Sequence, residues 1–329
     1  MSSASNLNTN IYINDLYKSY KLGNKNIDVL KSINLKVSDG EIVALMGPSG
    51  SGKSTLLHLI GILDQPDIGE VNLFGNFIKN MNDKQKTQFR LSNIGFVYQF
   101  HNLMLDFTAL ENTMMPQLIS GVSRNDSRLE SIRILENLGL KNRLNHKPTE
   151  MSGGEQQRVA IARALITQPR LILADEPTGA LDPVTSREVL ALFKDLHEND
   201  GVSFLLVTHS KEVAAFANRS LELRDGRFVA EHGESVDVEN LTKDRELIID
   251  ETGTVTLPPD LLVRLGGAGR YTVGNINSGY ISLQGESVES MGKMKLASSC
   301  PACKHEYGDS DEQLCPSCGS SRPMVEVKQ

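Results

Sequence analysis

A glycine-rich segment, GPSGSGKST, occupies residues 47–55, directly after the apolar run 42–46 and at the start of the apolar segment 55–63. It fits the pattern GxxxxGK[ST], in which glycines let the chain turn tightly between a buried strand and a helix. Backbone amides at the start of such a helix favour an anion such as phosphate. The segment therefore predicts an α/β fold with a phosphate-binding loop.

Individual residues of this loop have separate expected roles. We expect Lys53 to reach the β- and γ-phosphate oxygens of a bound nucleotide and the hydroxyl of Ser54 to bind Mg²⁺. The other loop residues expected to contact the nucleotide are Gly47, Ser49, Gly50, Ser51, Gly52 and Thr55. Glycine- and serine-rich turns also occur without a ligand, but the strand and helix on either side favour the nucleotide site.

Two adjacent carboxylates follow a second apolar run, in the sequence LILADE at residues 171–176. Ligands of open α/β sheets bind where the parallel strands end. We expect Asp175 to join the magnesium site and Glu176 to polarise the attacking water. An acidic turn after a core strand is the alternative, and the phosphate loop makes it the weaker one.

Apolar periodicity indicates a mixed α/β domain with parallel strands and helical crossovers. Residues 108–150 have the spacing of packed helices, which predicts a helical insertion. In the first part of the chain we expect strands over 11–46 and 71–98, the latter interrupted by a polar helix at 83–92, and a helix at 55–63. Later in the chain we expect helices at 153–167, 183–199 and 210–218 that alternate with strands at 171–175 and 203–207.

Charge and hydropathy bear on the class of partner. The formal net charge of −7 over 329 residues provides no general basic field, so nucleic acid is not the expected partner. The first residues, SSASNLNTN, lack the positive start and apolar core of a targeting signal, and no apolar run approaches the length of a membrane span. The sequence therefore predicts a cytoplasmic protein.

The segment MSGGEQQR, residues 151–158, precedes the carboxylate strand. Its glycines would let backbone amides approach an anion at the start of a helix. With the phosphate loop, this segment resembles the signature motif of ABC ATPases. The resemblance implies that Ser152, Gly153, Gly154 and Glu155 contact an ATP molecule held by the phosphate loop of a second subunit.

Further motifs of that family occur in the expected order. Gln99 matches the Q-loop residue, which contacts ATP and its magnesium ion; Asp182 lies in the D-loop; and His209 matches the switch histidine. Tyr20 matches the aromatic residue that stacks on adenine, with Tyr17 as the alternative. The resemblance thus implies an ATP-hydrolysing homodimer in which Glu176, His209, Gln99 and Lys53 are catalytic.

The stretch 95–119, GFVYQFHNLMLDFTALENTMMPQLI, is similar to the lipoprotein-releasing (LolD-type) and macrolide-export group. This resemblance covers about residues 11–233 and implies that integral membrane subunits on separate chains are the partners, with the protein on the inner face of the membrane. The sequence departs from the group at Asn102, Leu105 and Met151. We expect these positions to lie on the surface that faces the membrane subunit rather than at the phosphates.

The C-terminal part carries all of the cysteines, at positions 300, 303, 315 and 318. Two CxxC pairs separated by eleven residues predict a structural Zn²⁺ site of Cys300, Cys303, Cys315 and Cys318, and resemble a zinc ribbon. A redox-active CxxC is the alternative, but it would normally lie in a βαβ context. Residues 246–267 resemble the swapped hairpin of AbrB-type transcription factors, although acidic residues in 246–290 outnumber arginines by six to two and disfavour DNA binding.

The expected organisation follows from these motifs. It comprises a disordered N-terminus (1–10), an ABC ATPase domain (11–233) with a helical subdomain at about 100–165, a linker (234–245), a β-rich AbrB-like module (246–285), a second linker (286–299), a zinc ribbon-like module (300–319) and a tail (320–329). A soluble ABC ATPase acting outside transport is the alternative function. Loss of the catalytic carboxylate would indicate regulation without hydrolysis, but Glu176 is present.

Overall fold

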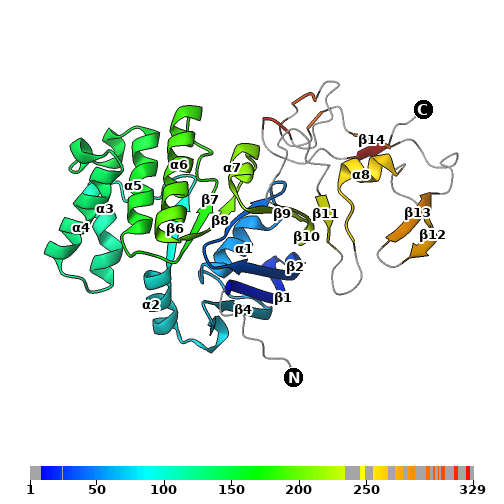
Figure 1. Cartoon of the computed structure of the whole chain (residues 1–329), viewed down its shortest axis with the longest axis horizontal. Helices are drawn as coiled ribbons and strands as arrows, with labels where there is room; N and C mark the ends of the chain where they lie inside the picture. Colours follow the sequence, from blue (N-terminus) through cyan, green and yellow to red (C-terminus); the bar gives the residue numbers. More distant parts are fainter. Residues whose placement is uncertain are drawn as a thin grey trace. The chain divides into compact units, whose positions relative to one another are not determined.

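The computed structural model describes residues 9–23, 25–233, 245–248, 255–265, 271–277, 280–285, 294–296, 299–300, 303, 305–307, 315–317 and 324–326. The chain divides into two compact units, Met1–Glu246 and Leu247–Gln329 (Figure 1). Most of the expected linker 234–245 and Cys318 lie outside the described residues. Within the described part, no helix has the length and apolar character needed to cross a membrane.

A largely parallel sheet forms the centre of the first unit, with strand order β11-β10-β9-β3-β8-β7-β6. Strands β3, β8, β7 and β6 run parallel, and β9 is parallel to β3 but antiparallel to β10. The strands are β3 (Ile42–Met46), β6 (Ile94–Tyr98), β7 (Leu171–Asp175), β8 (Ser203–Val207), β9 (Arg219–Arg224), β10 (Arg227–His232) and β11 (Arg245–Leu247). The mixed α/β prediction is confirmed.

The register of this sheet determines where the site can lie. Leu45, Val207, Asp175 and Tyr98 are successive partners across β3, β8, β7 and β6. The residues that follow these strands therefore emerge at one edge of the sheet. All residues of β8 are buried, as expected for a strand covered on both faces.

A second, antiparallel sheet has the order β2-β1-β4-β5. Its strands are β1 (Thr9–Leu22), β2 (Lys25–Ser38), β4 (Ile68–Leu73) and β5 (Asn76–Phe77). The expectation that residues 1–10 are disordered is wrong at Asn10, which is 2% exposed and donates to Asp39 Oδ1 at 2.8 Å and Ser203 Oγ at 2.7 Å. These two hydrogen bonds order Asn10, and they could not be predicted from the local sequence because both partners are distant in the chain.

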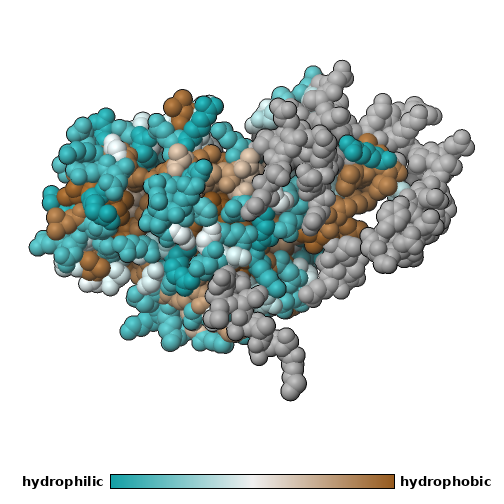
Figure 2. Space-filling model, in the orientation of Figure 1, coloured by the Kyte–Doolittle hydropathy of each residue, from teal (hydrophilic) through white to brown (hydrophobic). Residues whose placement is uncertain are grey.

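The helices are α1 (Lys53–Ile60), α2 (Asp83–Asn93), α3 (Ala109–Ile119), α4 (Arg124–Asn137), α5 (Gly153–Leu165), α6 (Pro183–Asp200) and α7 (Lys211–Phe216), with short 3-10 helices at Ile78–Asn80, Lys141–Arg143 and Pro148–Glu150. Figure 1 shows α3, α4 and α5 gathered at one end of the first unit. Helix α1 begins two residues earlier than expected and ends at Ile60, because Gly61 caps it and Ile62 has φ 57°. Hydrophilic residues predominate on the face of this unit in Figure 2.

The second unit contains α8 (Pro259–Arg264) and the antiparallel pair β12 (Tyr271–Asn277) and β13 (Tyr280–Gly285). Strand β14 (Met294–Leu296) lies in the expected linker 286–299, and β15 (Met324–Glu326) lies in the expected tail 320–329. These strands pair antiparallel, so neither segment is wholly irregular. Strands of three residues are too short to produce a recognisable alternation.

Candidate active site

The glycine-rich loop connects β3 to α1 and depends on glycine at its tightest points. A Cβ atom on Gly47 would lie 2.1 Å from the carbonyl oxygen of Leu223, and Gly47 has φ 141°. A Cβ atom on Gly52, the N-cap of α1, would lie 2.8 Å from Leu30 Cδ2. A Cβ atom on Gly50 would meet nothing within 4 Å, so the middle of the loop faces open space. An anion can therefore approach the loop from that side.

Lys53 lies within this loop and donates from Nζ to the carbonyl oxygens of Gly47 and Pro48, each at 2.8 Å. Burial lowers the pKa of Lys53, and the carboxylates of Glu176 and Asp175 oppose that effect. The ammonium group is thus partly desolvated and has no carboxylate within ion-pair distance among the described residues. A phosphate would supply the missing negative charge.

Ser54 and Asp175 come together although they are 121 residues apart in the chain. Ser54 Oγ donates to Asp175 Oδ2 at 2.9 Å. Burial raises the pKa of the Asp175 carboxyl, and the neighbouring Glu176 acts in the same direction, while Ser54 and Lys53 oppose it. A hydroxyl and a carboxylate side by side next to a phosphate loop are oxygen ligands of the kind that Mg²⁺ prefers.

Glu176 turns the chain sharply at the end of β7, with φ 49°. Its N–H donates to the carbonyl of Val207 at 2.9 Å, and its Oε1 lies 2.8 Å from Nδ1 of His209. The hydrogen bond to Glu176 raises the pKa of His209, while burial and Lys53 lower it. The Glu176 side chain is 16% exposed and that of His209 is 55% exposed. A carboxylate held in this way can orient a water molecule near the phosphate loop.

Gln99 directly follows β6, whose last residue, Tyr98, is opposite Asp175. Its side chain is half-buried, and a Cβ atom on Gly179 would lie 3.0 Å from Gln99 Nε2. Gln99 thus lies at the same edge of the sheet as Asp175 and beside the segment that follows Glu176.

The segment expected to contact the nucleotide of a second subunit forms the start of α5. Ser152 Oγ accepts a hydrogen bond from the N–H of Glu155 at 3.3 Å, and Glu155 accepts one from the N–H of Ser152 at 2.8 Å. A Cβ atom on Gly153 would meet nothing within 4 Å, so this turn is open. A Cβ atom on Gly154 would lie 2.7 Å from Thr185 Cγ2, so Gly154 lets α5 approach α6.

Asp182 caps the neighbouring helix α6 by accepting hydrogen bonds from Val184 N at 3.0 Å and Thr185 N at 3.1 Å. Across the described residues of the first unit, no hydrogen bond or ion pair joins Ser152, Gly153, Gly154 or Asp182 to the loop 47–55. The structure therefore brings Lys53, Ser54, Asp175, Glu176 and His209 together, and leaves the start of α5 apart from them.

Comparison with known proteins decides the family. The family model described as "ABC transporter" matches residues 30–179. The lipoprotein-releasing system ATP-binding protein LolD of Geobacter metallireducens is 52% identical over 217 residues, which cover 66% of this chain and 96% of that protein. The chain belongs to the ABC transporter family. The LolD protein of Bacteroides fragilis is 45% identical over 219 residues, covering 67% of this chain and all of that protein.

Solved structures agree with this assignment. The dimeric post-hydrolysis structure of the ATP-binding cassette MJ0796 with ADP and Pi has a TM-score of 0.65 and 42% identity, and covers 68% of this chain and 99% of that one. The fold is thus the P-loop ABC ATPase fold, and the chain is an ATP-hydrolysing ABC transporter subunit that uses ATP and Mg²⁺. About a third of the chain lies outside this similarity.

The three positions at which the sequence was expected to depart from the lipoprotein-releasing and macrolide-export group lie at different depths in the structure. Leu105 is 61% exposed, but the expectation of a surface position is wrong for Met151, which is 8% exposed and belongs to the hydrophobic core. Asn102 has φ 47°, and its carbonyl accepts a hydrogen bond from Arg163 Nη1 at 2.6 Å. Arg163 Nη2 donates to the carbonyl of His101 at 2.7 Å. Hydrogen bonds from Arg163, on α5, therefore hold the backbone of the segment that follows Gln99.

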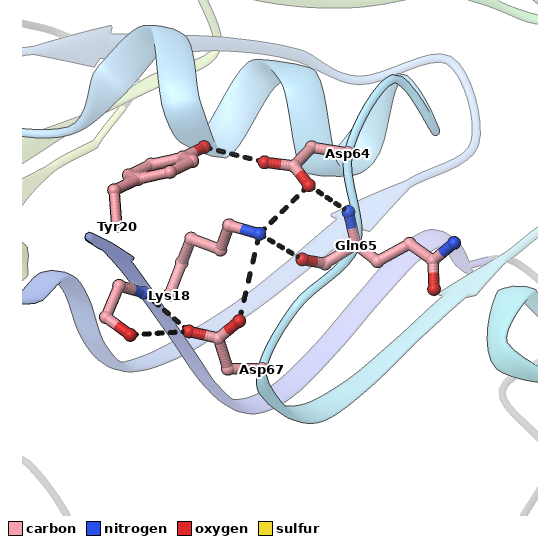
Figure 3. A network of polar contacts seen from close by, with 6 residues as sticks. Lys18, Tyr20, Asp64, Gln65 and Asp67 are labelled. Carbon is pink, nitrogen blue, oxygen red and sulfur yellow. Dashed lines mark hydrogen bonds and ion pairs between the residues drawn. The ribbon is translucent and has the colours of Figure 1, made fainter. Parts of the chain in front are cut away.

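Sequence reasoning missed residues that surround Tyr20. The Tyr20 hydroxyl donates to Asp64 Oδ2 at 2.7 Å, and Lys18 Nζ lies 5.0 Å from the Tyr20 ring centroid (Figure 3). Lys18 is two residues before Tyr20 on β1 and Asp64 follows α1, so only their charge was visible in the sequence. Arg163 was also missed, because the local sequence of a helix does not indicate which backbone carbonyl groups an arginine side chain contacts.

The cysteines form a separate cluster in the second unit. The Sγ atoms of Cys300, Cys303 and Cys315 all lie within 4.8 Å of one another, and the Sγ atoms of Cys303 and Cys315 are 3.4 Å apart. Cys300 and Cys315 are buried together with Tyr307. The expected fourth ligand, Cys318, lies outside the described residues.

Proposed function

We propose that this ABC subunit drives a transporter of the lipoprotein-releasing or macrolide-export type, as an ATP-dependent homodimer with membrane subunits on separate chains. The observation that carries the proposal is the pairing of Ser54 with Asp175 and of Glu176 with His209 at one edge of the parallel sheet. Similarity to lipoprotein-releasing relatives over nearly their whole length supports the cargo class.

The roles of the site residues follow from this arrangement. Magnesium-bound ATP supplies the γ-phosphate to be transferred and a divalent charge beside it. Lys53 and the backbone amides of residues 49–53 would hold the phosphates, and Ser54, Gln99 and Asp175 would provide oxygen ligands for the metal ion. Glu176 orients the water molecule. His209 keeps the Glu176 carboxylate in place through Nδ1, 2.8 Å from Oε1.

The homodimer is proposed because each chain contains both halves of a site without joining them. The open turn at Gly153 offers backbone N–H groups and the positive end of α5 to an anion. Ser152, Gly153 and Gly154 would then contact the γ-phosphate held by the other subunit. The dimeric state of MJ0796 supports this assignment.

A mixing experiment tests the composite site. Subunits with Ser152→Arg or Lys53→Ala are each expected to be inactive alone, because every site in either homodimer lacks one half. A mixed dimer keeps one intact site, so mixing should restore partial ATP hydrolysis. Absence of any activity above background at several mixing ratios would contradict a shared site with independent halves.

The proposed docking surface for the membrane subunit follows Gln99. Phe100 is 79% exposed, Leu105 61% and Phe107 37%, which is a concentration of apolar side chains in one short loop. Contact there would place the protein on the inner face of the cytoplasmic membrane.

The competing function is a soluble ABC ATPase outside transport, favoured only by the additional second unit. Co-purification with an integral membrane protein, lost in Phe100→Ser with Leu105→Ser, distinguishes these functions.

The cysteine cluster is proposed to be a structural zinc site. Tetrahedral zinc with Zn–S bonds of about 2.3 Å requires sulfur atoms roughly 3.8 Å apart. The 3.4 Å separation of Cys303 and Cys315 and the 4.8 Å limit for all three atoms fit this requirement. Cys318 completes the proposed ligand set. A site with four sulfur ligands leaves no coordination position for water, so the ion would hold the ribbon together rather than act in catalysis.

The remaining part of the second unit is proposed to be an AbrB-like module for dimerisation or docking. Helix α8 begins directly after the TLP sequence at 256–258, and the β12–β13 hairpin follows it. We assign residues 246–285 to this module and residues 300–319 to the zinc ribbon. The excess of acidic residues across 246–290 argues against DNA as its partner.

A further inference from the structure

A buried ammonium group connects the residue proposed to stack on adenine with the end of the phosphate-loop helix. Lys18 is 8% exposed, and its Nζ donates to Asp64 Oδ1 at 2.9 Å and to the carbonyl of Gln65 at 2.7 Å. Asp67 Oδ1 lies 3.8 Å from the same nitrogen. Asp64 and Gln65 follow α1, whereas Lys18 and Tyr20 lie on β1, as Figure 3 shows.

Asp64 holds both the ammonium group and the tyrosine. Its Oδ1 accepts from Lys18, and its Oδ2 accepts from the hydroxyl of Tyr20 at 2.7 Å. Burial opposes ionisation of Asp64, but hydrogen bonds from Tyr20, Lys18 and Gln65 outweigh it and lower its pKa. Burial and the bond to Asp64 raise the pKa of Tyr20 to about 12, so Tyr20 remains a hydrogen-bond donor at neutral pH.

The tyrosine ring itself is accessible, since Tyr20 is 42% exposed. The Lys18 ammonium lies 5.0 Å from the ring centroid. A side chain this exposed would sample several rotamers if only its ring were in contact with the protein. The bond from its hydroxyl to Asp64 fixes the other end of the ring and selects one orientation.

We propose that Asp64, held by Lys18, is a positioning residue that pre-orients Tyr20 to receive the adenine base of ATP. The proposal rests on the proposed stacking role of Tyr20. Because Asp64 follows the helix that begins at Lys53, the base-stacking ring and the phosphate loop are tied to one element. Binding then costs less side-chain entropy than it would with a free tyrosine.

Equilibrium binding to the full-length protein tests this proposal with a non-hydrolysable ATP analogue and with inorganic tripolyphosphate, which has no base. Tyr20→Phe keeps the ring and removes the anchor, and Asp64→Ala removes the acceptor. Each should raise the Kd for the ATP analogue by roughly threefold to tenfold, the range expected for ordering one side chain. Neither should change the Kd for tripolyphosphate. In the double variant, which combines Tyr20→Phe with Asp64→Ala, the Kd for the ATP analogue should be no higher than in the weaker-binding single variant.

The matched control is Asp67→Asn. Asp67 also lies near Lys18 and accepts hydrogen bonds from Ser19 N at 2.7 Å and Ser19 Oγ at 2.8 Å, but it does not contact the Tyr20 hydroxyl. It should leave the affinity for the ATP analogue unchanged. Equal weakening by Asp67→Asn and Asp64→Ala would overturn the proposal, because it would indicate a general effect of the charge cluster.

Tyr20→Ala separates failure of this inference from failure of the stacking role. If Tyr20→Ala leaves the affinity for the ATP analogue unchanged, Tyr20 does not stack on adenine and both assignments are wrong. If Tyr20→Ala weakens binding while Tyr20→Phe and Asp64→Ala do not, stacking holds and only the positioning role of Asp64 is wrong. Multiplicative losses in the double variant, or weaker tripolyphosphate binding in Asp64→Ala, would also overturn the positioning role.

Discussion

Glu176 Oε1 lies 2.8 Å from His209 Nδ1, although the two residues are 33 positions apart. Asp175 is opposite Val207 in the parallel pair β7–β8. Glu176 and His209 lie just beyond the ends of these two strands, so the pairing of the strands brings their side chains together. Ser54, near the start of α1, donates to Asp175, the last residue of β7, at the same edge of the sheet. His209 therefore holds the Glu176 carboxylate, which we propose orients the attacking water, at this edge of the sheet.

The Glu176–His209 contact should make stability depend on pH. Its hydrogen bond raises the pKa of His209 above the ordinary 6.5, against burial and Lys53. The stabilisation is therefore fully present below pH 6.5 and is lost as pH rises through the raised folded-state pKa. Thermal unfolding of wild type and His209→Gln across pH should show a difference that is largest at low pH, at most about 1 kcal/mol because solvent screens the exposed imidazole. A difference that grows as pH rises would contradict the assignment.

Arg163 should stabilise the segment after Gln99. It donates to the carbonyls of His101 and Asn102, whose backbones have φ 58° and 47°. Arg163→Met keeps the length of the side chain but leaves these carbonyls without their donor, and should lower the free energy of unfolding by about 1–3 kcal/mol. Denaturant unfolding measures the change, with the exposed Arg133→Met as the control. Equal, small effects of both variants would show that the contacts are dispensable.

Much of the site could be predicted from local sequence, because a phosphate loop and a strand ending in adjacent carboxylates each imply their own backbone geometry. The loop, β7 and β8 were expected where the structure has them. The Lys18–Asp64–Tyr20 contacts could not be predicted, since they depend on how β1 packs beside the end of α1. The positive φ at Glu176 was likewise invisible, because glutamate carries no local preference for it.

The cysteine cluster should hold metal without taking part in hydrolysis. The protein should purify with about one zinc ion per chain, since a filled site has four sulfur ligands. Replacement of Cys300 and Cys303 by serine should release the ion, measured by elemental analysis, and leave ATP hydrolysis near the wild-type rate. Loss of hydrolysis in a variant that still folds and binds ATP would show that the second unit belongs to the catalytic machinery. Metal-free wild-type protein would contradict the zinc assignment.

Glu176→Gln tests the central claim most directly, because it replaces the carboxylate with a neutral group of the same size. ATP turnover and ATP binding should be measured on the same preparation, with the exposed Glu198→Gln as the control. Turnover should fall by at least about a hundredfold, the typical contribution of a general base, while ATP affinity stays at the wild-type value because Lys53 and the loop amides hold the phosphates. The control should retain full turnover. Steady-state hydrolysis near the wild-type rate in Glu176→Gln would contradict the catalytic assignment.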